Sequence, residues 1–197
     1  MQNIFLVGLS GSGKSTVGRI IAERLGKAFF DIDALIEQEC GEAISTLFTR
    51  SGEEYFRSCE SRVFGRVAQE EKTAVIATGG GVVTRVENRA LLRSRGVCIY
   101  LSVDAHTALE RLNAQSAQHL AVQESPEIRP LLVGPDPLGA LQHLLDARAQ
   151  WYEDAHFTCS TESKNVERVA QEIIAMLISS GELIDASPLV RQVRVGA

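Results

Sequence analysis

The stretch GLSGSGKST, residues 8–16, decides the fold of this chain, because it directly follows the apolar run IFLV (residues 4–7) and precedes a helical pattern. Its glycines let successive backbone N–H groups curl around nucleotide phosphates, Lys14 can neutralise the β- and γ-phosphates, and the Ser15 hydroxyl can ligate Mg²⁺. A glycine-rich turn without a ligand would not need Lys and Ser after its last glycine. The motif predicts a P-loop whose nucleotide-binding residues are Gly11, Ser12, Gly13, Lys14, Ser15 and Thr16. By itself it fits kinases, switch GTPases and motor-like ATPases.

Short apolar runs alternate with longer helical patterns along the rest of the chain. The runs predict strands at 4–7, 28–30, 74–77, 97–101 and, more weakly, 156–158. Strands that alternate with helices are typical of an α/β fold, with a parallel sheet covered by helices on both faces. Polar signatures directly follow the first three strands, namely the P-loop, Asp31-Ile32-Asp33 and Gly79-Gly80-Gly81. Open α/β sheets bind ligands at this carboxyl edge.

Length, charge and cysteine usage narrow the class of protein. A chain of 197 residues with 45% hydrophobic content can bury a full core and lies within the range of one domain. The net charge of −5 argues against a nucleic-acid surface and favours a small-molecule partner. The four cysteines stand far apart without a C-x-x-C pair, which suits reduced thiols. Because neither a signal peptide nor a membrane span is evident, we expect a cytoplasmic protein without a membrane partner. We also expect a monomer without a nucleic-acid partner.

One long segment has no clear place in the alternation of strands and helices. Residues 113–123 are rich in Gln, Ala and His, and four of the five prolines follow between residues 126 and 137. Long loops in compact domains are usually functional or disordered, so we interpret about 113–135 as a mobile lid; an ordinary surface insertion is the alternative. A single domain is expected over residues 1–179. The tail, 180–197, is then either disordered or packed on a neighbour.

Two arginines interrupt the apolar faces of predicted helices. On the helix expected over 53–70, Glu60 falls on the buried stripe and Arg57 lies one turn away. A solvated surface pair is possible, but the position beside an apolar face favours a partly buried arginine held by Glu60. The stripe itself consists of Phe56, Val63 and Val67.

The second arginine, Arg148, falls on the face of a helix that begins at Asp136-Pro137. That face is traced by Leu138, Leu141, Leu145 and Tyr152. A buried, unpaired charge costs several kcal/mol, so Arg148 needs an anionic partner, for which a substrate carboxylate would serve. The alternative is that its guanidinium reaches the rim of the apolar face.

Asp31 and Asp33 are two positions apart at the end of an extended segment, so both side chains are expected to point toward the P-loop edge. One could hold Mg²⁺ through water while the other orients an acceptor hydroxyl. Asp33 could instead be the N-cap of a helix starting at Ala34, a role not expected for Asp31. The triple glycine at 79–81 lets backbone N–H groups approach a ligand, although a tight turn would use glycine too.

These residues together resemble the shikimate kinase family, a branch of the nucleoside-monophosphate-kinase-like P-loop fold with three layers and strand order 2-3-1-4-5. The resemblance runs from about residue 3 to residue 177. It rests on residues 8–16, 30–33 and 79–81, on Ile44, Phe48, Gly52-Glu53, Phe56-Arg57 and Glu60, on Arg129-Pro130-Leu131-Leu132, and on Arg148, Tyr152 and Ala155. Members of this family transfer the γ-phosphoryl group of ATP to the 3-hydroxyl of shikimate, in the chorismate route to aromatic amino acids.

The resemblance implies roles for individual residues. Shikimate would be held by Asp33, Arg57, Gly79, Gly80, Gly81 and Arg148. The catalytic residues would be Lys14, Asp33 and the lid arginine, Arg129, which would also contact ATP. Mg²⁺ would be served by Ser15 and Asp31, and Arg111 is the candidate for stacking on adenine.

Two departures from the family and two alternative functions follow from the same residues. The stretch between Arg111 and Arg129 is longer than the usual lid, and the proline expected on the other side of adenine is replaced near Asn165-Val166.

The P-loop would also suit a gluconate or adenylylsulfate kinase, although the combination of Arg57, the triple glycine and Arg148 argues against both. A nucleotide-dependent switch module would need neither Asp33 nor a carboxylate clamp.

Overall fold

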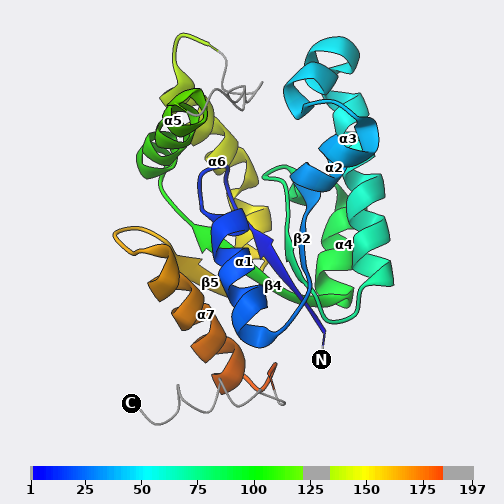
Figure 1. Ribbon diagram of the computed structural model, residues 1–197, viewed down its shortest axis with the longest axis vertical. Coiled ribbons are helices and arrows are strands. Elements are labelled where there is room, and N and C mark those ends of the chain that lie inside the picture. The colour runs from blue at the N-terminus through cyan, green and yellow to red at the C-terminus, as the bar shows by residue number, and fades with distance from the viewer. Residues whose placement is uncertain (1, 122–133, 184–197) are drawn as a thin grey trace.

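The computed structural model describes residues 2–121 and 134–183. The strands are β1 (Asn3–Val7), β2 (Phe29–Asp31), β3 (Val75–Ala77), β4 (Gly96–Ser102) and β5 (Phe157–Ser160). The helices are α1 (Lys14–Leu25), α2 (Ile32–Cys40), α3 (Ile44–Glu70), α4 (Val86–Ser94), α5 (Ala105–Ala121), α6 (Pro137–Glu153) and α7 (Val166–Ser179), with a short 3₁₀ turn η1 (Val82–Thr84). Figure 1 shows their arrangement around the sheet.

The strands form one parallel sheet of five in the order β2-β3-β1-β4-β5. This confirms the predicted fold class and strand order, and each predicted strand lies within two residues of the observed bounds. The central strand, β1, pairs with β3 on one side and β4 on the other, and all of its residues are buried. A strand covered on both faces is expected to be apolar throughout, as the run at residues 4–7 is.

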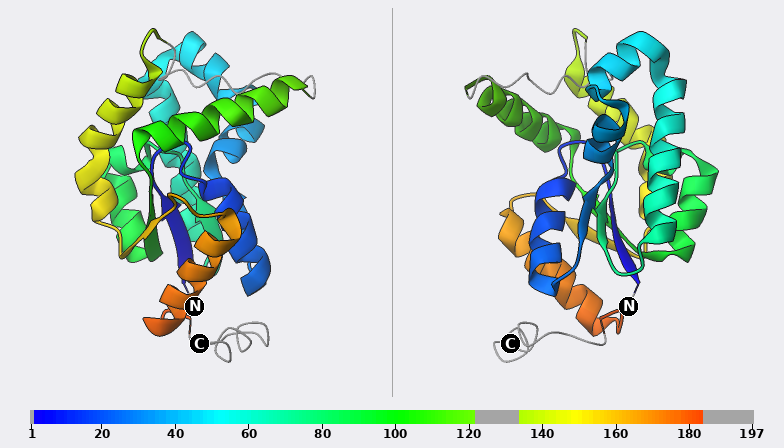
Figure 2. Two further views of the ribbon diagram at one scale, coloured as in Figure 1. Left: turned by 90° about the vertical axis from the view of Figure 1, so that its left-hand side faces the viewer. Right: turned by 45° about the vertical axis from the view of Figure 1, so that its right-hand side comes forward.

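The three layers follow from the alternation of side chains along β1. Ile4 and Leu6 pack against α1 and α7, whereas Phe5 and Val7 face the opposite cluster, to which α2, α3, α4 and α6 contribute. Figure 2 shows α1 and α7 on one side of the sheet and α3 and α4 on the other, with α5 crossing above its carboxyl edge. The two hydrophobic clusters therefore hold the sheet between helical layers.

The helix that carries Arg57 is longer than predicted. α3 begins at Ile44 rather than near Glu53, and its helical backbone is interrupted at Gly52 (φ 79°, ψ 171°). Glycine adopts this positive φ without the strain other residues would suffer. The predicted helix is thus the part after the kink, and its buried stripe is confirmed, with Phe56, Val63 and Val67 at most 4% exposed.

The second predicted helix begins as expected, with the Asp136 carboxylate accepting the Gly139 N–H at 2.8 Å. Its apolar face is only partly confirmed: Leu141 and Tyr152 are fully buried, but Leu138 is 39% exposed. Leu138 sits in the first turn, immediately after the described chain resumes, and lies beyond the cluster that Leu141 joins with α5.

Several predictions concern residues at the limits of the described chain. Residues 113–121 of the predicted lid are the end of α5, while 122–133, including Arg129, lie outside the described residues. Of the predicted tail, 180–183 are described, and Leu183 packs in the cluster with α1 and α7. All four cysteines are free. Within 2–121 and 134–183, no helix is long and apolar enough to cross a membrane.

Candidate active site

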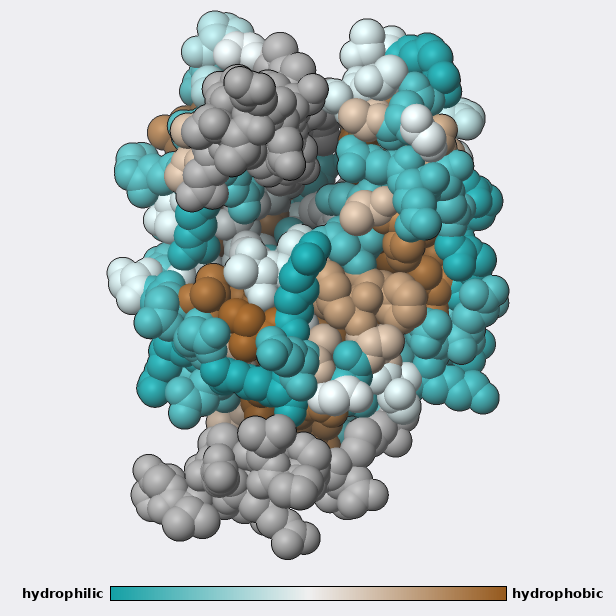
Figure 3. All heavy atoms as spheres, viewed as in Figure 1, coloured by the Kyte–Doolittle hydropathy of each residue, from teal (hydrophilic) through white to brown (hydrophobic). Residues whose placement is uncertain are grey.

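The polar signatures predicted to meet at one edge of the sheet do so. The P-loop follows β1, Asp31 ends β2, and the triple glycine follows β3, all at the carboxyl ends of parallel, neighbouring strands. The surface in Figure 3 is notched at this end of the molecule, on the side where α2 and the start of α3 project. The three signatures therefore lie together at the edge where a ligand site was predicted, and the ligand site itself stays a prediction.

The P-loop is shaped by close backbone contacts. A Cβ on Gly8 would lie 2.6 Å from the Leu101 carbonyl oxygen, and one on Gly11 (φ +83°) would lie 2.6 Å from that of Ala108. Only glycine fits between these backbones. The loop ends at Gly13, in the left-handed conformation, which directs the start of α1 and its unpaired N–H groups toward the loop.

Lys14 is drawn back over the loop that precedes it. Its Nζ donates to the carbonyl oxygens of Gly8 and Leu9, each at 2.9 Å, and the residue is 8% exposed. The two residues that follow, Ser15 and Thr16, are exposed in the first turn of α1. The ammonium is therefore positioned at the mouth of the loop, where phosphates would enter.

Arg111 reaches from α5 to the P-loop side of the site. It donates to the Thr161 carbonyl oxygen at 2.7 Å and hydroxyl at 2.9 Å, and more weakly to the Gly11 carbonyl oxygen at 3.4 Å. Its guanidinium plane is thus held beside Gly11 and the segment after β5. This position suits the predicted contact with a nucleotide base, which stays a prediction.

The two aspartates differ in role from what was predicted. The extended segment ends at Asp31, whose carboxylate accepts the Asp33 N–H at 3.1 Å and caps α2. The prediction that Asp33 could be the cap and that Asp31 has no such role was wrong, because the helix starts at Ile32 rather than Ala34. The two side chains therefore do not extend from one strand.

Asp33 instead reaches the glycine loop from the first turn of α2. Its Oδ1 lies 2.7 Å from the point a Gly79 Cβ would occupy, and Glu60 Oε1 lies 2.4 Å from the same point. A side chain at position 79 would therefore collide with two carboxylates. Glycine at position 79 thus leaves room for the close approach of α2 and α3 to the loop.

Arg57 and Glu60 form the buried pair that the helix pattern predicted. Arg57 Nη1 lies 2.8 Å from Glu60 Oε2, the Glu60 side chain is 0% exposed, and Glu53 contacts the same guanidinium at 3.2 Å. Burial disfavours the charge on Arg57, but the two carboxylates outweigh it and raise its pKa. Burial raises the pKa of Glu60, and Arg57 opposes that shift. Among the described residues, Glu60 Oε1 has no hydrogen-bond partner.

Arg148 is buried as predicted, at 7% exposure, and it too meets the glycine loop. Its Nη1 donates to the Gly80 carbonyl oxygen at 3.1 Å. The same oxygen accepts from the Tyr152 hydroxyl at 2.5 Å. Glu60 is close enough for the charge of Arg148 to lower its pKa. The structure thus brings Asp33, Arg57, Arg148 and residues 79–81 together, around the loop after β3.

Gly81 offers a test of how closely Arg57 is fitted. Its backbone (φ −99°, ψ −4°) is one that alanine adopts, yet a Cβ there would lie 1.9 Å from Arg57 Nη1. With the roles that the resemblance implies for Arg57 and the P-loop, we expect Gly81→Ala to displace the guanidinium and to raise the KM for the acceptor about tenfold or more, with little change in the KM for ATP. Steady-state kinetics measure both constants.

The control for this substitution is Gly65→Ala. Gly65 lies inside α3, where a Cβ would meet only Leu91 Cδ1 at 3.8 Å, an ordinary contact. It should leave both KM values unchanged and slightly favour the helix. If the Gly81→Ala variant had the same acceptor KM as the unsubstituted protein, displacing the Arg57 guanidinium would not affect acceptor binding, and the prediction would be wrong.

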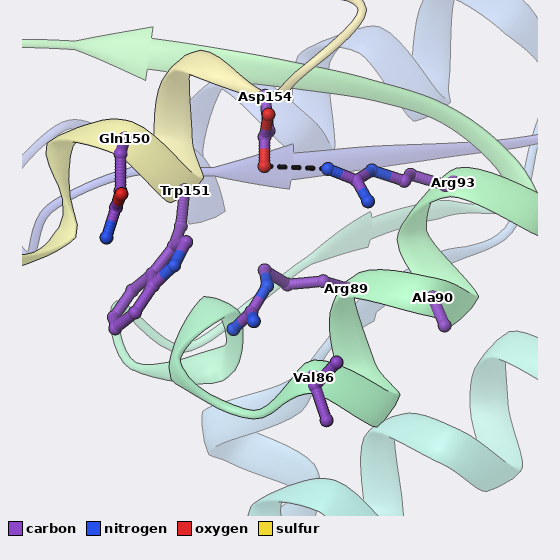
Figure 4. A pocket seen from close by; sticks show the side chains of 7 residues that line it. All are labelled: Val86, Arg89, Ala90, Arg93, Gln150, Trp151 and Asp154. Atoms are coloured by element: carbon purple, nitrogen blue, oxygen red, sulfur yellow. Dashed lines mark hydrogen bonds and ion pairs between the residues drawn. The ribbon is translucent and has the colours of Figure 1, made fainter.

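A pocket of about 340 Å³ lies elsewhere, between α4 and α6. Figure 4 shows Arg89 beside the ring of Trp151, with the guanidinium 5.0 Å from the ring centroid, and Arg93 paired with Asp154 at 2.7 Å. None of the predicted site residues lines it. The predicted site residues lie at the carboxyl edge of the sheet and not at this pocket.

Three contacts of the site were not predicted from sequence. Glu53 holds Arg57, and their i,i+4 spacing on one helix could have indicated this. Thr161 holds Arg111, and Tyr152 holds Gly80, across 50 and 72 positions. No local pattern signals a pair so far apart.

A P-loop at the end of β1, with two buried arginines around an adjacent glycine loop, defines the class of P-loop small-molecule kinases. The family model described as shikimate kinase matches residues 10–178. A shikimate kinase of Symbiobacterium thermophilum is 43% identical over 92% of this chain and 99% of its own length, and one of Synechococcus sp. (strain CC9605) is 43% identical over 90% and 83%. The chain belongs to the shikimate kinase family of ATP-dependent kinases.

A solved structure agrees with this placement. The shikimate kinase from Acinetobacter baumannii, in complex with shikimate, superposes with a TM-score of 0.81 at 35% identity, covering 91% of this chain and 94% of its own. The resemblance to the shikimate kinase family, which the motifs indicated, is confirmed. The alternatives of a gluconate kinase, an adenylylsulfate kinase or a switch module are not favoured.

Proposed function

We propose that this protein transfers the γ-phosphoryl group of ATP to the 3-hydroxyl of shikimate, giving shikimate 3-phosphate and ADP. The observation that carries this proposal is the meeting of Arg57 and Arg148 around the glycine loop beside the P-loop. The phosphoryl donor enters at the P-loop, and the acceptor is held next to it by the arginines. Phosphoryl transfer needs this positioning more than covalent help from the protein.

The hydrogen-bond donors of the acceptor side favour a substrate carboxylate. Two guanidiniums are buried there: that of Arg57 pairs with Glu60 and Glu53, and that of Arg148 donates one N–H to the Gly80 carbonyl oxygen. A guanidinium has five N–H donors, so Arg148 has more of them than this one bond uses. A carboxylate matches the planar guanidinium group, and shikimate carries one.

Asp33 is proposed to receive the proton of the attacking hydroxyl. It is partly buried at the start of α2, with its Oδ1 over Gly79; the next residue, Gly80, lies against the P-loop, and the one after it, Gly81, lies against Arg57. The transition state is loose, so the hydroxyl needs little activation early, and the proton leaves late. Asp33 thus orients the acceptor first and takes the proton as the new bond forms.

Ser15 and Asp31 are proposed to hold Mg²⁺. The donor set fits this ion, because Mg²⁺ prefers hard oxygen ligands and is usually bound through one or two carboxylates plus substrate phosphates. Within 2–121 and 134–183, no cluster of three or more His, Cys, Asp or Glu could hold a metal ion, and the proposed site includes phosphate oxygens of the nucleotide. When bound, the ion would neutralise charge on the phosphates.

Chelation with EDTA should abolish ADP release from ATP and shikimate, and added Mg²⁺ should restore it.

Lys14 is proposed to bind the β- and γ-phosphates, and Arg111 to contact the adenine. Lys14 would exchange its bonds to the Gly8 and Leu9 carbonyl oxygens for phosphate oxygens. Arg129, outside the described residues, is proposed to stabilise the transferring group from the lid.

We further propose that the protein is a cytoplasmic monomer. Sedimentation at working concentration tests its oligomeric state.

An acceptor panel tests the proposed reaction. ADP release should be fast with shikimate and slow with quinate, gluconate or adenylylsulfate. Quinate and gluconate also carry a carboxylate and hydroxyls, so this comparison tests whether the spacing of these groups in shikimate suits Arg57, Arg148 and Asp33. ATP turnover that ignores every acceptor would contradict the proposal.

Removing either arginine should weaken shikimate far more than ATP. Arg57→Ala and Arg148→Ala are each expected to cost roughly 2 to 5 kcal/mol of shikimate binding, because each leaves a desolvated carboxylate short of a charged partner. Calorimetry with each ligand measures the difference. Arg62→Ala is the control on the same helix, since that side chain is 59% exposed and pairs with Glu39. Equal losses for both ligands would contradict the clamp.

A further inference from the structure

Tyr152 is a buried phenol whose hydroxyl reaches the acceptor site. It lies on α6, one turn after Arg148, and is 0% exposed. Its hydroxyl donates to the Gly80 carbonyl oxygen at 2.5 Å, the same oxygen to which Arg148 Nη1 donates at 3.1 Å. The Gly80 carbonyl oxygen thus accepts two hydrogen bonds from side chains of α6.

The environment of Tyr152 keeps it a fixed donor. Burial raises the pKa of its hydroxyl to about 12, so it stays protonated at working pH. Its ring stacks on Tyr100 of β4, with centroids 5.1 Å apart and planes 13° from parallel. The stack limits movement of the ring, and the hydroxyl is therefore held against Gly80.

The loop after Gly80 is fixed by other elements. The Thr84 hydroxyl donates to the Gly81 carbonyl oxygen at 2.8 Å, and Arg89 of α4 donates to that of Val83 at 2.7 Å. These contacts set the path of the loop but do not involve α6. The bonds from Tyr152 and Arg148 to the Gly80 carbonyl oxygen tie the loop to α6, and the bond from Tyr152 is the shorter of the two.

We propose that Tyr152 is a positioning residue for the acceptor carboxylate: it fixes the Gly80 carbonyl, and that carbonyl holds one edge of the Arg148 guanidinium so that the other faces the substrate. This rests on the proposed function, in which Arg148 binds the carboxylate of shikimate. Tyr152 itself needs no contact with substrate. Without its hydroxyl, the buried carbonyl would draw more strongly on Arg148 and turn it from the substrate.

The test compares Tyr152→Phe with Tyr100→Phe, using shikimate and the carboxamide of shikimate as acceptors. Both substitutions remove one phenolic oxygen from the same stacked pair, but only the first removes the donor to Gly80. Tyr152→Phe should raise the KM for shikimate about tenfold, with kcat and the KM for ATP nearly unchanged. The KM for the carboxamide should change less than twofold, because it lacks the charge that Arg148 binds. Tyr100→Phe should leave all of these values unchanged.

The fold is followed separately through Trp151, the single tryptophan of the chain. Its fluorescence and the melting temperature should be nearly the same in both variants. Equal losses for shikimate and the carboxamide would show that Tyr152 acts only on packing, and would overturn the proposal. An unchanged KM for shikimate would overturn it as well.

A second variant keeps the test decisive if Tyr152→Phe loses stability. Adding Tyr152→Phe to Arg148→Ala should not change the preference for shikimate over the carboxamide any further, because the arginine that Tyr152 positions is already gone. A further fall of the preference in the double variant would overturn the proposal. If Arg148→Ala alone left the preference intact, the carboxylate clamp itself would be wrong, which distinguishes failure of the proposed function from failure of this inference.

Discussion

Replacing Lys14 with alanine is expected to lower kcat by about a hundredfold to a thousandfold, the loss typical of a single charge-stabilising donor in a transition state. The Lys14 ammonium lies at the mouth of the P-loop and, in the proposed reaction, compensates charge on the β- and γ-phosphates as the bond between them breaks. No other lysine of the described chain lies in the P-loop. A coupled ADP-release assay at saturating ATP and shikimate measures the change.

The fold should survive this substitution. The buried Gly8 and Leu9 carbonyl oxygens lose a donor, which costs roughly 1 to 3 kcal/mol, a loss that the folded chain should tolerate. Lys72→Ala is the control, since Lys72 is exposed in the turn before β3, at the opposite edge of the sheet. A Lys14→Ala protein that turns over within threefold of the unsubstituted one would remove Lys14 from the mechanism.

The second large effect is expected for Asp33→Asn, which should lower kcat by about a hundredfold to ten-thousandfold while weakening shikimate only modestly. Asparagine keeps an acceptor oxygen for the shikimate hydroxyl and fits the space over Gly79, but it cannot take the proton. The split between kcat and KM separates this role from simple binding. Pre-steady-state measurement of the first turnover shows whether the chemical step is the one slowed.

Asp104→Asn is the matched control for Asp33→Asn. Asp104 also stands at the start of a helix, where its carboxylate accepts the Thr107 N–H at 2.8 Å, so the substitution makes the same change in charge near a helix terminus. It should leave kcat unchanged. If both variants lost little activity, Asp33 would be an ordinary acidic residue in the first turn of α2.

The sheet and the nucleotide loop could be predicted because their signals are local. The apolar run before residues 8–16, and the run before each later polar signature, are continuous stretches whose length and boundaries indicate buried parallel strands. Parallel strands end at the same edge, so the meeting of P-loop, Asp31 and triple glycine followed from connectivity alone. Glu60 was likewise found from its place on an apolar helical face, and its full burial confirms that interpretation.

The Asp31–Asp33 pair marks the limit of local patterns. Two aspartates two positions apart fit a continuing strand or a helix start equally well, and the choice depends on where the first N–H groups of α2 find an acceptor. In the folded chain Asp31 supplies it, and Asp33 moves into the first helical turn. Leu138 shows the same limit, because its exposure depends on where α6 leaves the packed cluster.

The acceptor side was decided by tertiary packing. Periodicity placed Arg57 and Arg148 near buried faces, but it could not say that both would meet the glycine loop, because each contact joins segments far apart in the chain. A buried charge is stable only where carboxylates and carbonyl oxygens converge on it, and that convergence exists only once α2, α3 and α6 pack around the end of β3. The sequence alone thus specified which residues could do this chemistry, while the packing of three helices on one loop determined where they act.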